Sequence, residues 1–358
     1  MHVRQILFIS SSIGLGHIVR DLAIVRQLRK RSPQLRVQWL AGHPASEYLE
    51  AQGEETFTGN RALADMSATA ESAAEGGGLN LFRYVVAVRD AWRQNRDVFQ
   101  RVIETEGFDC VVADEAYELE AFLHRHPEEK QWPFIVIHDF IGIEASGGGL
   151  FERLGVWIIN RKWIQPKADL SLFVGVPDDI SDERFGFMLP NKREYASTRY
   201  RFIGQVIPFD PEGLPPRDIL RKELGFGTGP LLVCSAGGTA AGKPLLELCR
   251  DAFPFLRRQL HELTMLIAAG PRIDPEYLAV AGVGGNGRSG LQVLPFVPGL
   301  YRYFAAADLC IIQAGGMTSA ELSALDTPFF YIPLEGHSEQ EQHIFEKLRQ
   351  VECGIPLR

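Results

Sequence analysis

The chain repeats one local pattern, in which a short apolar run is followed by a glycine turn and then by a helical pattern. The pattern occurs at residues 5–10 before Gly14 and Gly16, at residues 231–235 before Gly237 and Gly238, and at residues 309–312 before Gly315 and Gly316. Apolar runs of this length are typical of buried strands in parallel sheets, whose two faces are covered by helices. The sequence therefore predicts an α/β protein with doubly wound, Rossmann-like sheets.

The chain is too long for one ordinary core, since 358 residues exceed the usual size of a single domain. Residues 208–217 contain four prolines, which favour a stiff, extended linker. The alternation of strands and helices resumes after them. We therefore expect two domains, residues 1–206 and 207–358, that face each other across a cleft.

Further elements follow from the apolar periodicity. Strands are expected at residues 37–41, 109–113, 134–138, 200–203, 264–269, 291–294 and 329–332. Helices are expected at residues 17–30, 81–103, 150–167, 243–260, 299–306, 317–325 and 339–350. Residues 70–80 and 142–149 are expected to be flexible loops because they are rich in glycine and small or polar residues.

Composition excludes several classes of protein. A net charge of −8 argues against a general nucleic-acid binder. The five cysteines are odd in number and show no C-x-x-C spacing, so neither a disulfide framework nor a zinc site is expected. No D-x-D pair or other metal-ligand cluster is evident, so no metal is required. The N-terminal apolar run is too short for a signal peptide, and no run approaches the ~20 residues of a membrane span, which predicts a cytoplasmic protein.

The first glycine turn, with Gly14 and Gly16, leads directly to His17. A dehydrogenase fingerprint would need a third glycine where this chain has Arg20, so hydride transfer is disfavoured. His17 is expected at the start of a helix and at the carboxyl end of the first strand. The helix dipole disfavours a charged imidazole there, which would keep His17 available as a neutral base. Its alternative role is simply to cap the helix.

Asp114 comes directly after the predicted strand at residues 109–113 and should lie at the same edge of the sheet as His17. A carboxylate there could orient the imidazole and stabilise its protonated form. Asp114 could instead be a loop or helix-capping residue. Asp139, after the next strand, is a competing partner for His17. Glu115 is the immediate neighbour of Asp114 in sequence.

The two glycine loops of the C-terminal half predict a diphosphate site. Backbone N–H groups at a helix start and the helix dipole both favour an anion. The first loop lacks the Walker pattern, because Lys243 is followed by Pro244. Glu321 lies one and a half turns into the second helix, where its carboxylate could accept hydrogen bonds from sugar hydroxyls. Glu339 and Gln340 either cap a helix or recognise sugar hydroxyls.

Three longer motifs resemble a known family. "GLGHIVRDLAIVRQLRKR" near the N-terminus is similar to the G-x-G-H start of two-domain glycosyltransferases of the GT-B fold. "LPFVPGLYRYFAAADLCIIQAGGMTSAEL" resembles the donor-binding signature of that family, and "EGHSEQEQHI" resembles its sugar-contacting pattern. The chain thus resembles the UDP-sugar transferases of families 1 and 28, the group that includes the peptidoglycan N-acetylglucosaminyl transferase.

The resemblance implies a role for each matching position. His17 would be the general base, with Asp114 as its partner, beside the acceptor-side loop of Gly14 and Gly16. The donor nucleotide would be bound by Phe296 and Val297 at the base, by Gly237, Gly238, Thr239, Gln313, Gly315, Gly316, Met317 and Thr318 at the diphosphate, and by Glu321 at the ribose. Glu339 and Gln340 would contact the donor sugar.

Three departures from the family pattern stand out. Gln313 occupies the place of a phosphate-binding histidine or arginine, which leaves more of the leaving-group charge to backbone amides. His343 replaces the usual asparagine after Glu339 and Gln340. The chain stops at Arg358, so a final helix that crosses back to the N-terminal domain is expected to be missing.

The expected activity is an inverting, metal-independent transfer of a hexose from a UDP-linked sugar to an acceptor hydroxyl. The alternatives are a UDP-sugar 2-epimerase and a non-catalytic nucleotide-sugar-binding subunit. The acceptor is expected to be a small molecule or a lipid, selected by loops at residues 56–80 and 142–165. The helix at residues 150–167 mixes aromatic and basic residues, so it either packs the domain, lines the acceptor site or lies on a membrane surface.

Overall fold

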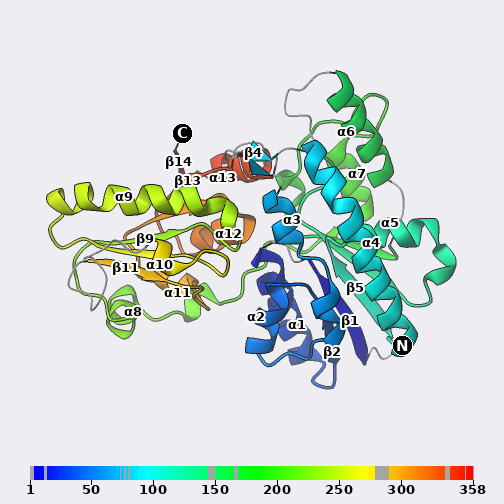
Figure 1. The fold of residues 1–358 in the computed structure, drawn as a ribbon, viewed down its shortest axis with the longest axis horizontal. Helices are drawn as coiled ribbons and strands as arrows, with labels where there is room; N and C mark the ends of the chain where they lie inside the picture. The colour runs from blue at the N-terminus through cyan, green and yellow to red at the C-terminus, as the bar shows by residue number, and fades with distance from the viewer. Residues whose placement is uncertain are drawn as a thin grey trace. The chain divides into compact units, whose positions relative to one another are not determined.

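The computed structural model describes residues 4–11, 14–72, 74–75, 78–79, 81–143, 150–164, 168–278, 290–334, 339–350 and 352–357. The chain divides into two compact units. Unit 1 comprises Met1–Ala73 and Asn80–Pro208, and unit 2 comprises Ala74–Leu79 and Phe209–Arg358. Figure 1 labels the elements of both units.

Unit 1 contains a six-stranded parallel sheet with the strand order β2-β1-β5-β6-β7-β8. Its strands are β1 (Gln5–Ser10), β2 (Arg36–Leu40), β5 (Cys110–Asp114), β6 (Phe134–His138), β7 (Leu170–Phe173) and β8 (Tyr200–Phe202). Nearly every residue of β1, β5 and β6 is buried, which is why these strands are continuous apolar runs.

Helices cover this sheet. They are α1 (Gly16–Arg31), α2 (Ala45–Ala51), α3 (Met66–Ser72), α4 (Leu81–Thr105), α5 (Tyr117–Arg125), α6 (Leu150–Trp163) and α7 (Lys192–Arg199), with short 3₁₀ turns at Thr58–Ala62, Pro127–Glu129 and Pro177–Asp179. Phe99 of α4 and Phe122 of α5 belong to the same buried cluster as Val111 of β5. This cluster covers one face of the sheet beside the strands that carry the candidate site.

Unit 2 contains a second six-stranded parallel sheet, with the order β11-β10-β9-β12-β13-β14. Its strands are β9 (Leu231–Ser235), β10 (Thr264–Ala268), β11 (Leu291–Leu294), β12 (Leu309–Gln313), β13 (Phe329–Ile332) and β14 (Ile355–Pro356). The short strands β3 (Ala74–Glu75) and β4 (Gly78–Leu79) form a separate antiparallel pair.

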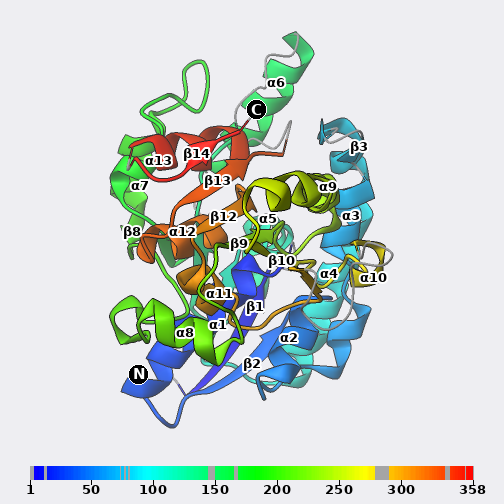
Figure 2. The ribbon, with the colours of Figure 1, turned by 90° about the vertical axis from the view of Figure 1, so that its left-hand side faces the viewer.

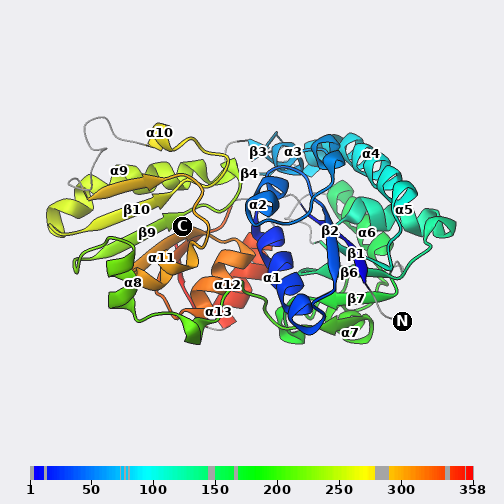
Figure 3. The ribbon, with the colours of Figure 1, turned by 90° about the horizontal axis from the view of Figure 1, so that it is seen from below.

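The helices of unit 2 lie on both faces of its sheet. They are α8 (Arg217–Glu223), α9 (Lys243–Gln259), α10 (Pro275–Leu278), α11 (Tyr301–Ala306), α12 (Gly316–Ala324) and α13 (Phe345–Gln350), with 3₁₀ turns at Pro211–Gly213 and Ala240–Gly242. One buried cluster joins α9 and α10 to the sheet, and another joins α8, α11, α12 and α13 to it. Figures 2 and 3 show α9 and α8 on opposite sides of the strands. The predicted fold class, two doubly wound α/β sheets, is confirmed.

Several predicted elements need correction. The single helix expected at residues 339–350 is a π-helical segment, Glu339–Ile344, followed by α13. The loop expected at residues 70–80 contains the end of α3 and the strands β3 and β4. The helix expected at 150–167 is described to Trp163, and most of the loop expected at 142–149 lies outside the described residues.

The sequence pattern also missed elements, among them β7, α5, α7 and β14. These elements are short, and in β7 only Phe173 is fully buried, so their apolar periodicity is weak. Within the described ranges, no helix combines the length and the apolar character needed to cross a membrane.

Candidate active site and donor site

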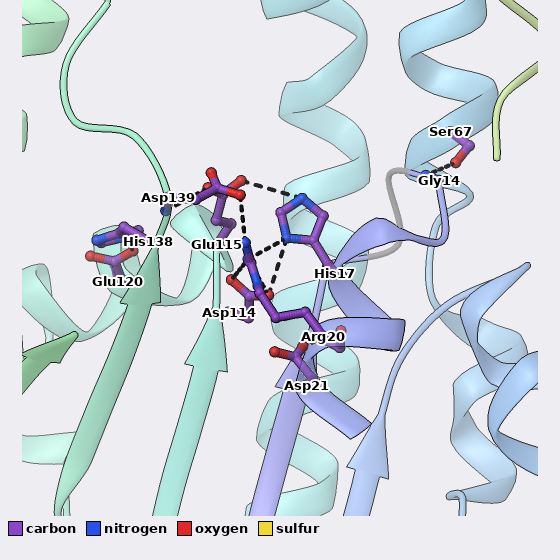
Figure 4. A network of polar contacts seen from close by, with 11 residues as sticks. Gly14, His17, Arg20, Asp21, Ser67, Asp114, Glu115, Glu120, His138 and Asp139 are labelled. Carbon is purple, nitrogen blue, oxygen red and sulfur yellow. Dashed lines mark hydrogen bonds and ion pairs between the residues drawn. The ribbon is translucent and has the colours of Figure 1, made fainter. Parts of the chain in front are cut away.

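The strand order in the sheet of unit 1 reverses between β1 and β5. Strand β1 pairs with β2 on one side and with β5 on the other, so the connections on either side of this point turn opposite ways. Open α/β sheets bind ligands outside the carboxyl ends of their strands at such a point. Ser10 and Asp114, the last residues of the two strands, are paired in register. Since α1 begins at Gly16, His17 lies in its first turn beside Asp114 (Figure 4).

His17 and Asp114, which the sequence pattern proposes as partners, are in contact. Nδ1 of His17 lies 3.1 Å from Oδ2 of Asp114. The Asp114 side chain is fully buried, whereas that of His17 keeps 17% of its surface exposed. The carboxylate is therefore reached only by its protein neighbours, while the imidazole remains accessible to an incoming group.

The acceptor-side glycines Gly14 and Gly16 act on the backbone. Gly14 has a φ of 71°, a left-handed conformation that favours glycine, and its N–H donates to Oγ of Ser67 at 2.8 Å. Gly16 is the first residue of α1, and its N-cap neighbour Leu15 makes no side-chain capping bond. The loop is thus anchored to α3 before it delivers His17.

Arg20 is a site residue that the sequence reasoning missed. Its Nη2 atom lies 2.8 and 2.7 Å from the two carboxylate oxygens of Asp114 and 2.9 Å from Nδ1 of His17. Its Nη1 atom donates to Oδ2 of Asp139 at 2.5 Å. The available signal was its spacing, because residues three apart on a helix share a face. The Asp114 carboxylate therefore contacts both a guanidinium and an imidazole.

The shared position of Nδ1 fixes which tautomer can act as a base. With its proton on Nδ1, His17 donates to Asp114 and leaves Nε2 free to accept a proton. With its proton on Nε2, Nδ1 accepts from Arg20 instead, and the outer nitrogen is no longer basic. Only the first arrangement supports general-base chemistry. Whether Nδ1 pairs with Asp114 or with Arg20 therefore decides whether His17 can act as a base.

Glu115 faces the other side of the imidazole. Its Oε2 atom lies 3.6 Å from Nε2 of His17, and its Oε1 atom accepts from the backbone N–H of Asp139 at 3.5 Å. Glu115 has a φ of 49°, which is uncommon for a residue with a long side chain. Strained backbone of this kind is found most often at functional sites. The turn after β5 thus aims a second carboxyl group at His17.

The charges of the cluster shift its protonation equilibria. Burial lowers the pKa of His17, but the charge and hydrogen bond of Asp114 outweigh it, so that the pKa lies above its usual value. Burial raises the pKa of Asp114, but Arg20 and His17 together lower it to about 2. Burial and the neighbouring Asp139 hold the pKa of Glu115 well above its usual range. Asp114 is therefore ionised and Glu115 takes up a proton readily.

His17, Glu115 and Asp139 each offer one ligand atom, and these atoms lie within 4.8 Å of one another. The guanidinium of Arg20 is hydrogen-bonded to Asp139, so a fixed positive charge already lies beside these atoms. A divalent cation would be repelled by it. The arrangement favours a site whose positive charge comes from Arg20.

A small cavity of about 80 Å³ adjoins this cluster at the carboxyl ends of β1, β2 and β5. Its lining includes the apolar residues Ile9, Leu40, Leu63, Met66, Trp92 and Phe99, and its polar members include Ser10, Asn95, Arg96, Glu115 and Glu118. An apolar group bound there would lie next to Glu115. This cavity is the candidate acceptor subsite within unit 1.

The sheet of unit 2 has its own switch point, between β9 and β12. The predicted glycine loops follow these two strands, so they lie at neighbouring strand ends. Gly315 is the N-cap of α12 and makes no side-chain capping bond, which leaves the first N–H groups of the helix without a side-chain cap. Gly316, Met317 and Thr318 form that first turn. Such N–H groups can bind an anion, and phosphate binding at this turn stays a prediction.

Gln313 lies where the two glycine loops pack closely together. It is the last residue of β12, and a Cβ atom at Gly242 would lie 2.6 Å from its Oε1 atom and 2.2 Å from Cβ of Ala236. A Cβ atom at Gly270 would lie 2.5 Å from the carbonyl oxygen of Gly237. Gly242 and Gly270, which the sequence reasoning did not assign, are therefore required by close packing of these loops. Gly238 and Thr239 lie between Gly237 and the turn at Ala240–Gly242.

Glu321 lies inside α12 with only 8% of its surface exposed. Among the described residues, no hydrogen bond to its carboxylate is present, and burial raises its pKa to about 8. The hydroxyl of Ser319 on the same helix is also buried without a partner in the described part of the chain. Both groups gain if a ligand with hydroxyls binds beside them.

The remaining donor-site residues are less defined by their contacts. Phe296 and Val297 are both half-buried, and both follow β11 at the edge of the sheet. Oε1 of Gln340 accepts from the backbone N–H of Leu334 at 2.8 Å. Glu339 begins the π-helical segment, and its side chain lies outside the described set. Their contacts with a nucleotide sugar stay a prediction.

Residues 232–353 match the model of the glycosyltransferase family 28 C-terminal domain. An uncharacterised glycosyltransferase of Methanopyrus kandleri is 25% identical over 226 residues, which cover 63% of this chain and 57% of that protein. A UDP-N-acetylglucosamine–N-acetylmuramyl-(pentapeptide) pyrophosphoryl-undecaprenol N-acetylglucosamine transferase of Nocardia farcinica is 35% identical over 131 residues, covering 35% of this chain and 32% of that protein. The chain thus spans between a third and just over half of the length of these relatives.

Solved structures show the same fold. The calicheamicin glycosyltransferase CalG4 matches with a TM-score of 0.58 and 16% identity, over 100% of this chain and 86% of that one. The structure of UGT89C1 from Arabidopsis thaliana matches with a TM-score of 0.57 and 13% identity, over 99% of this chain and 85% of that one. This protein therefore has the GT-B fold of these solved structures, and its residues 232–353 are similar to the glycosyltransferase family 28 C-terminal domain.

Proposed function

We propose that this protein is an inverting, metal-independent hexosyltransferase that moves a sugar from a UDP-linked donor to an acceptor hydroxyl. The observation that carries the proposal is the 3.1 Å contact between His17 and Asp114 at the switch point of the first sheet. The family 28 domain at residues 232–353 supports a nucleotide-sugar donor. The name of the Nocardia relative, a UDP-N-acetylglucosamine transferase, supports uridine as the base.

In the proposed reaction, Nε2 of His17 removes the proton of the acceptor hydroxyl as its oxygen attacks the anomeric carbon. The new bond forms on the face opposite the bond to the diphosphate, which breaks, so the configuration inverts. Asp114 stays ionised and stabilises the imidazolium through Nδ1. No covalent enzyme intermediate is needed.

The departing diphosphate gains negative charge, and in this proposal backbone groups of unit 2 stabilise that charge. The first N–H groups of α12 and the glycine loop after β9 supply hydrogen-bond donors, and the helix dipole favours the anion. Gln313 contributes a neutral amide where relatives carry a cationic side chain. Backbone amides must therefore carry most of the stabilisation. Glu321 would bind the ribose hydroxyls, and Glu339 and Gln340 the sugar.

A cytoplasmic location is part of this proposal, and the acceptor is a small molecule or a lipid-linked compound. The cysteines Cys110, Cys234, Cys249, Cys310 and Cys353 are all free thiols, as expected in a reducing compartment. The Nocardia relative is named for an acceptor on pyrophosphoryl-undecaprenol, which supports a lipid-linked acceptor. The apolar lining of the small cavity beside Glu115 supports an apolar group near the hydroxyl.

The test is release of UDP from a set of UDP-sugars, followed with and without candidate acceptors. Acceptor-dependent release by the wild type, lost in His17→Ala and kept in His124→Ala, is the expected result. His124 is exposed on α5 and serves as the matched histidine control. Absence of release with every donor, together with tight UDP binding, would instead identify a binding subunit.

A second candidate activity is UDP-sugar 2-epimerisation. The observation that favours it is the set of carboxyl groups near His17, since Glu115 and Asp139 accompany Asp114. Epimerisation needs several acid and base groups around one sugar. It predicts an isomerised UDP-sugar without any acceptor, which the same incubation distinguishes from transfer.

A further inference from the structure

Asp21 is a buried carboxyl group that the proposed reaction does not use. It follows Arg20 on α1, and its side chain is fully buried. Figure 4 includes it in the polar network around His17. Burying a carboxyl group is costly unless its oxygens find partners, so the groups around Asp21 decide which form it takes.

Asp21 is hydrogen-bonded at the strand ends of the site. The hydroxyl of Ser10 donates to Oδ2 of Asp21 at 2.6 Å. Ser10 is the last residue of β1, and its partner in the register of the sheet is Asp114, the last residue of β5. The carboxyl groups of Asp21 and Asp114 therefore lie at the same pair of strand ends.

The second oxygen of Asp21 receives no hydrogen bond. In the described part of the chain, no donor reaches Oδ1, which is buried. The guanidinium of Arg20 bonds to Asp114 and Asp139 instead, at 2.7 and 2.5 Å. A buried carboxylate that has no cation and only one donor is strongly disfavoured. We therefore expect Asp21 to be the neutral acid, with its proton on Oδ1.

The electrostatics of the cluster supports the neutral form. Burial and the charge of Asp114 raise the pKa of Asp21 well above its usual value. Arg20 and Ser10 offset only part of this rise. Burial raises the pKa of Asp114 too, but Arg20 and His17 lower it to about 2. The two carboxyl groups are hydrogen-bonded to each other, which requires one proton between them. That proton therefore belongs to Asp21.

We propose that Asp21 is a positioning residue, whose neutral carboxyl group donates a hydrogen bond to Asp114 and so holds the Asp114 carboxylate in place against His17. Ser10 fixes the carbonyl oxygen Oδ2, which leaves the O–H on Oδ1 to donate. The inference rests on the proposed function, in which His17 is the general base. It adds to that function a group that acts through Asp114 and does not touch the substrate.

The hydrogen bond from Asp21 has two consequences for Asp114. Arg20 and His17 already contact this carboxylate, at 2.7 and 3.1 Å from Oδ2, and a third donor restricts its rotation further. The third donor also withdraws negative charge from the carboxylate, which then accepts less strongly from His17. Asp21 therefore limits how far Asp114 raises the pKa of the imidazole.

The neutral form of Asp21 also sets the net charge of the cluster. Burial raises the pKa of Asp114 and of Asp139, but the neighbouring guanidinium outweighs it and keeps both ionised. Burial and these anions raise the pKa of Asp21 and of Glu115, so that both are neutral. With the guanidinium, the cluster has one net negative charge, which the imidazolium of His17 cancels. An ionised Asp21 would add a second negative charge and hold the proton on the base.

Infrared difference spectroscopy of the full chain tests the protonation of Asp21 without any substrate. The C=O stretch of a neutral carboxylic acid is separate from the bands of a carboxylate and shifts in heavy water. We expect Asp21→Asn to lose one such signal at neutral pH. Asp90→Asn, at an exposed aspartate on α4, is the control and should keep it. Equal acid signals in the wild type and Asp21→Asn would show an ionised Asp21 and overturn the proposal.

Titration of His17 by NMR, together with the pH–rate profile of transfer, tests the contact with Asp114. Asp21→Asn keeps a donor for Asp114 and an acceptor for Ser10, so both the pKa of His17 and kcat should stay near wild type. Asp21→Leu has a similar shape and neither group. Asp114 then accepts more strongly from His17, whose pKa should rise by about one pH unit. We expect kcat at neutral pH to fall at least about tenfold, with KM unchanged.

Rescue by asparagine is the decisive comparison. If Asp21→Asn is as impaired as Asp21→Leu while both fold, the site needs the charge of Asp21 and the proposal is wrong. An unchanged pKa of His17 in a folded Asp21→Leu overturns it as well. If Asp21→Leu does not fold, the infrared comparison decides. The spectra and the titration need no acceptor, so a wild type that transfers no sugar would count against the proposed function alone.

Discussion

Nη2 of Arg20 lies 2.9 Å from Nδ1 of His17 while it also bonds both oxygens of Asp114. One guanidinium nitrogen thus touches both members of the proposed catalytic pair. It neutralises much of the charge that would otherwise raise the basicity of His17. The site is better described as a His–Asp–Arg arrangement than as a simple pair.

Replacing His17 should remove the chemical step and little else. We expect His17→Ala to lower the rate of sugar transfer at least ~100-fold, because general bases contribute that much or more. UDP binding, measured by calorimetry, should stay within about twofold of wild type, since His17 belongs to unit 1 and the proposed nucleotide loops to unit 2. A variant with near-normal single-turnover rates would remove His17 from the mechanism.

Arg20 should set the pH dependence of the reaction. The positive charge of Arg20 lowers the pKa of His17, so Arg20→Gln should raise that pKa further. Activity requires neutral His17 and therefore rises with pH through this pKa. The acid limb of the pH–rate profile should move to higher pH in Arg20→Gln. Arg26→Gln, an exposed arginine on the same helix, should leave the profile in place.

Glu115 is expected to support activity while its backbone conformation lowers the stability of the fold. Its φ of 49° favours glycine, and its buried carboxyl group lies beside that of Asp139. Glu115→Gly should keep or raise the free energy of unfolding, by about 1 kcal/mol, while transfer activity falls. Asp326→Gly, at a φ of 51° in the exposed turn after α12, should stabilise the protein without loss of activity. Loss of both stability and activity in Glu115→Gly would indicate a purely structural role.

Glu321 should make unit 2 less stable as the pH rises. Its folded pKa of about 8 exceeds the ordinary value of 4.5, so between these values the folded state binds more protons than the unfolded state. Stability is therefore full below pH 4.5 and declines up to about pH 8, by on the order of a few kcal/mol. Glu321→Gln should flatten this decline in urea titrations and weaken nucleotide binding. Glu276→Gln, at an exposed glutamate, should change neither quantity.

Gly242 should tolerate no side chain. A Cβ atom there would meet Ala236 and Gln313 at distances that real Cβ atoms do not show. We expect Gly242→Ala to cost about 1–3 kcal/mol of stability and to weaken UDP binding, because the glycine loops must move apart. Gly227→Ala, whose Cβ atom would meet nothing within 4 Å, is the matched control. Equal behaviour of the two variants would refute the close packing of these loops.

The sequence predicted several strands from their apolar runs. The runs at residues 134–138 and 231–235 coincide with strands that are almost completely buried, since a strand covered on both faces is a continuous apolar run. The runs at residues 291–294 and 329–332 also coincide with strands, although these are only partly buried. Strand β7, which is as short and as partly buried as β11, was missed. The helix at residues 339–350 was assigned one geometry, and periodicity alone does not distinguish a π-helical turn from an α-helical one.

The sequence by itself determined which residue types stand at the ends of strands: His17 in the turn after β1, Asp114 at the end of β5, and glycines after β9 and β12. These assignments are local, because a strand, its turn and the following helix are contiguous in the chain. Tertiary structure decided what those residues meet. Arg20 joins His17 through their spacing on α1, but Asp114, Glu115 and Asp139 meet this pair only because the sheet order places β1, β5 and β6 side by side. Strand order and register are set by packing between segments that lie far apart in sequence.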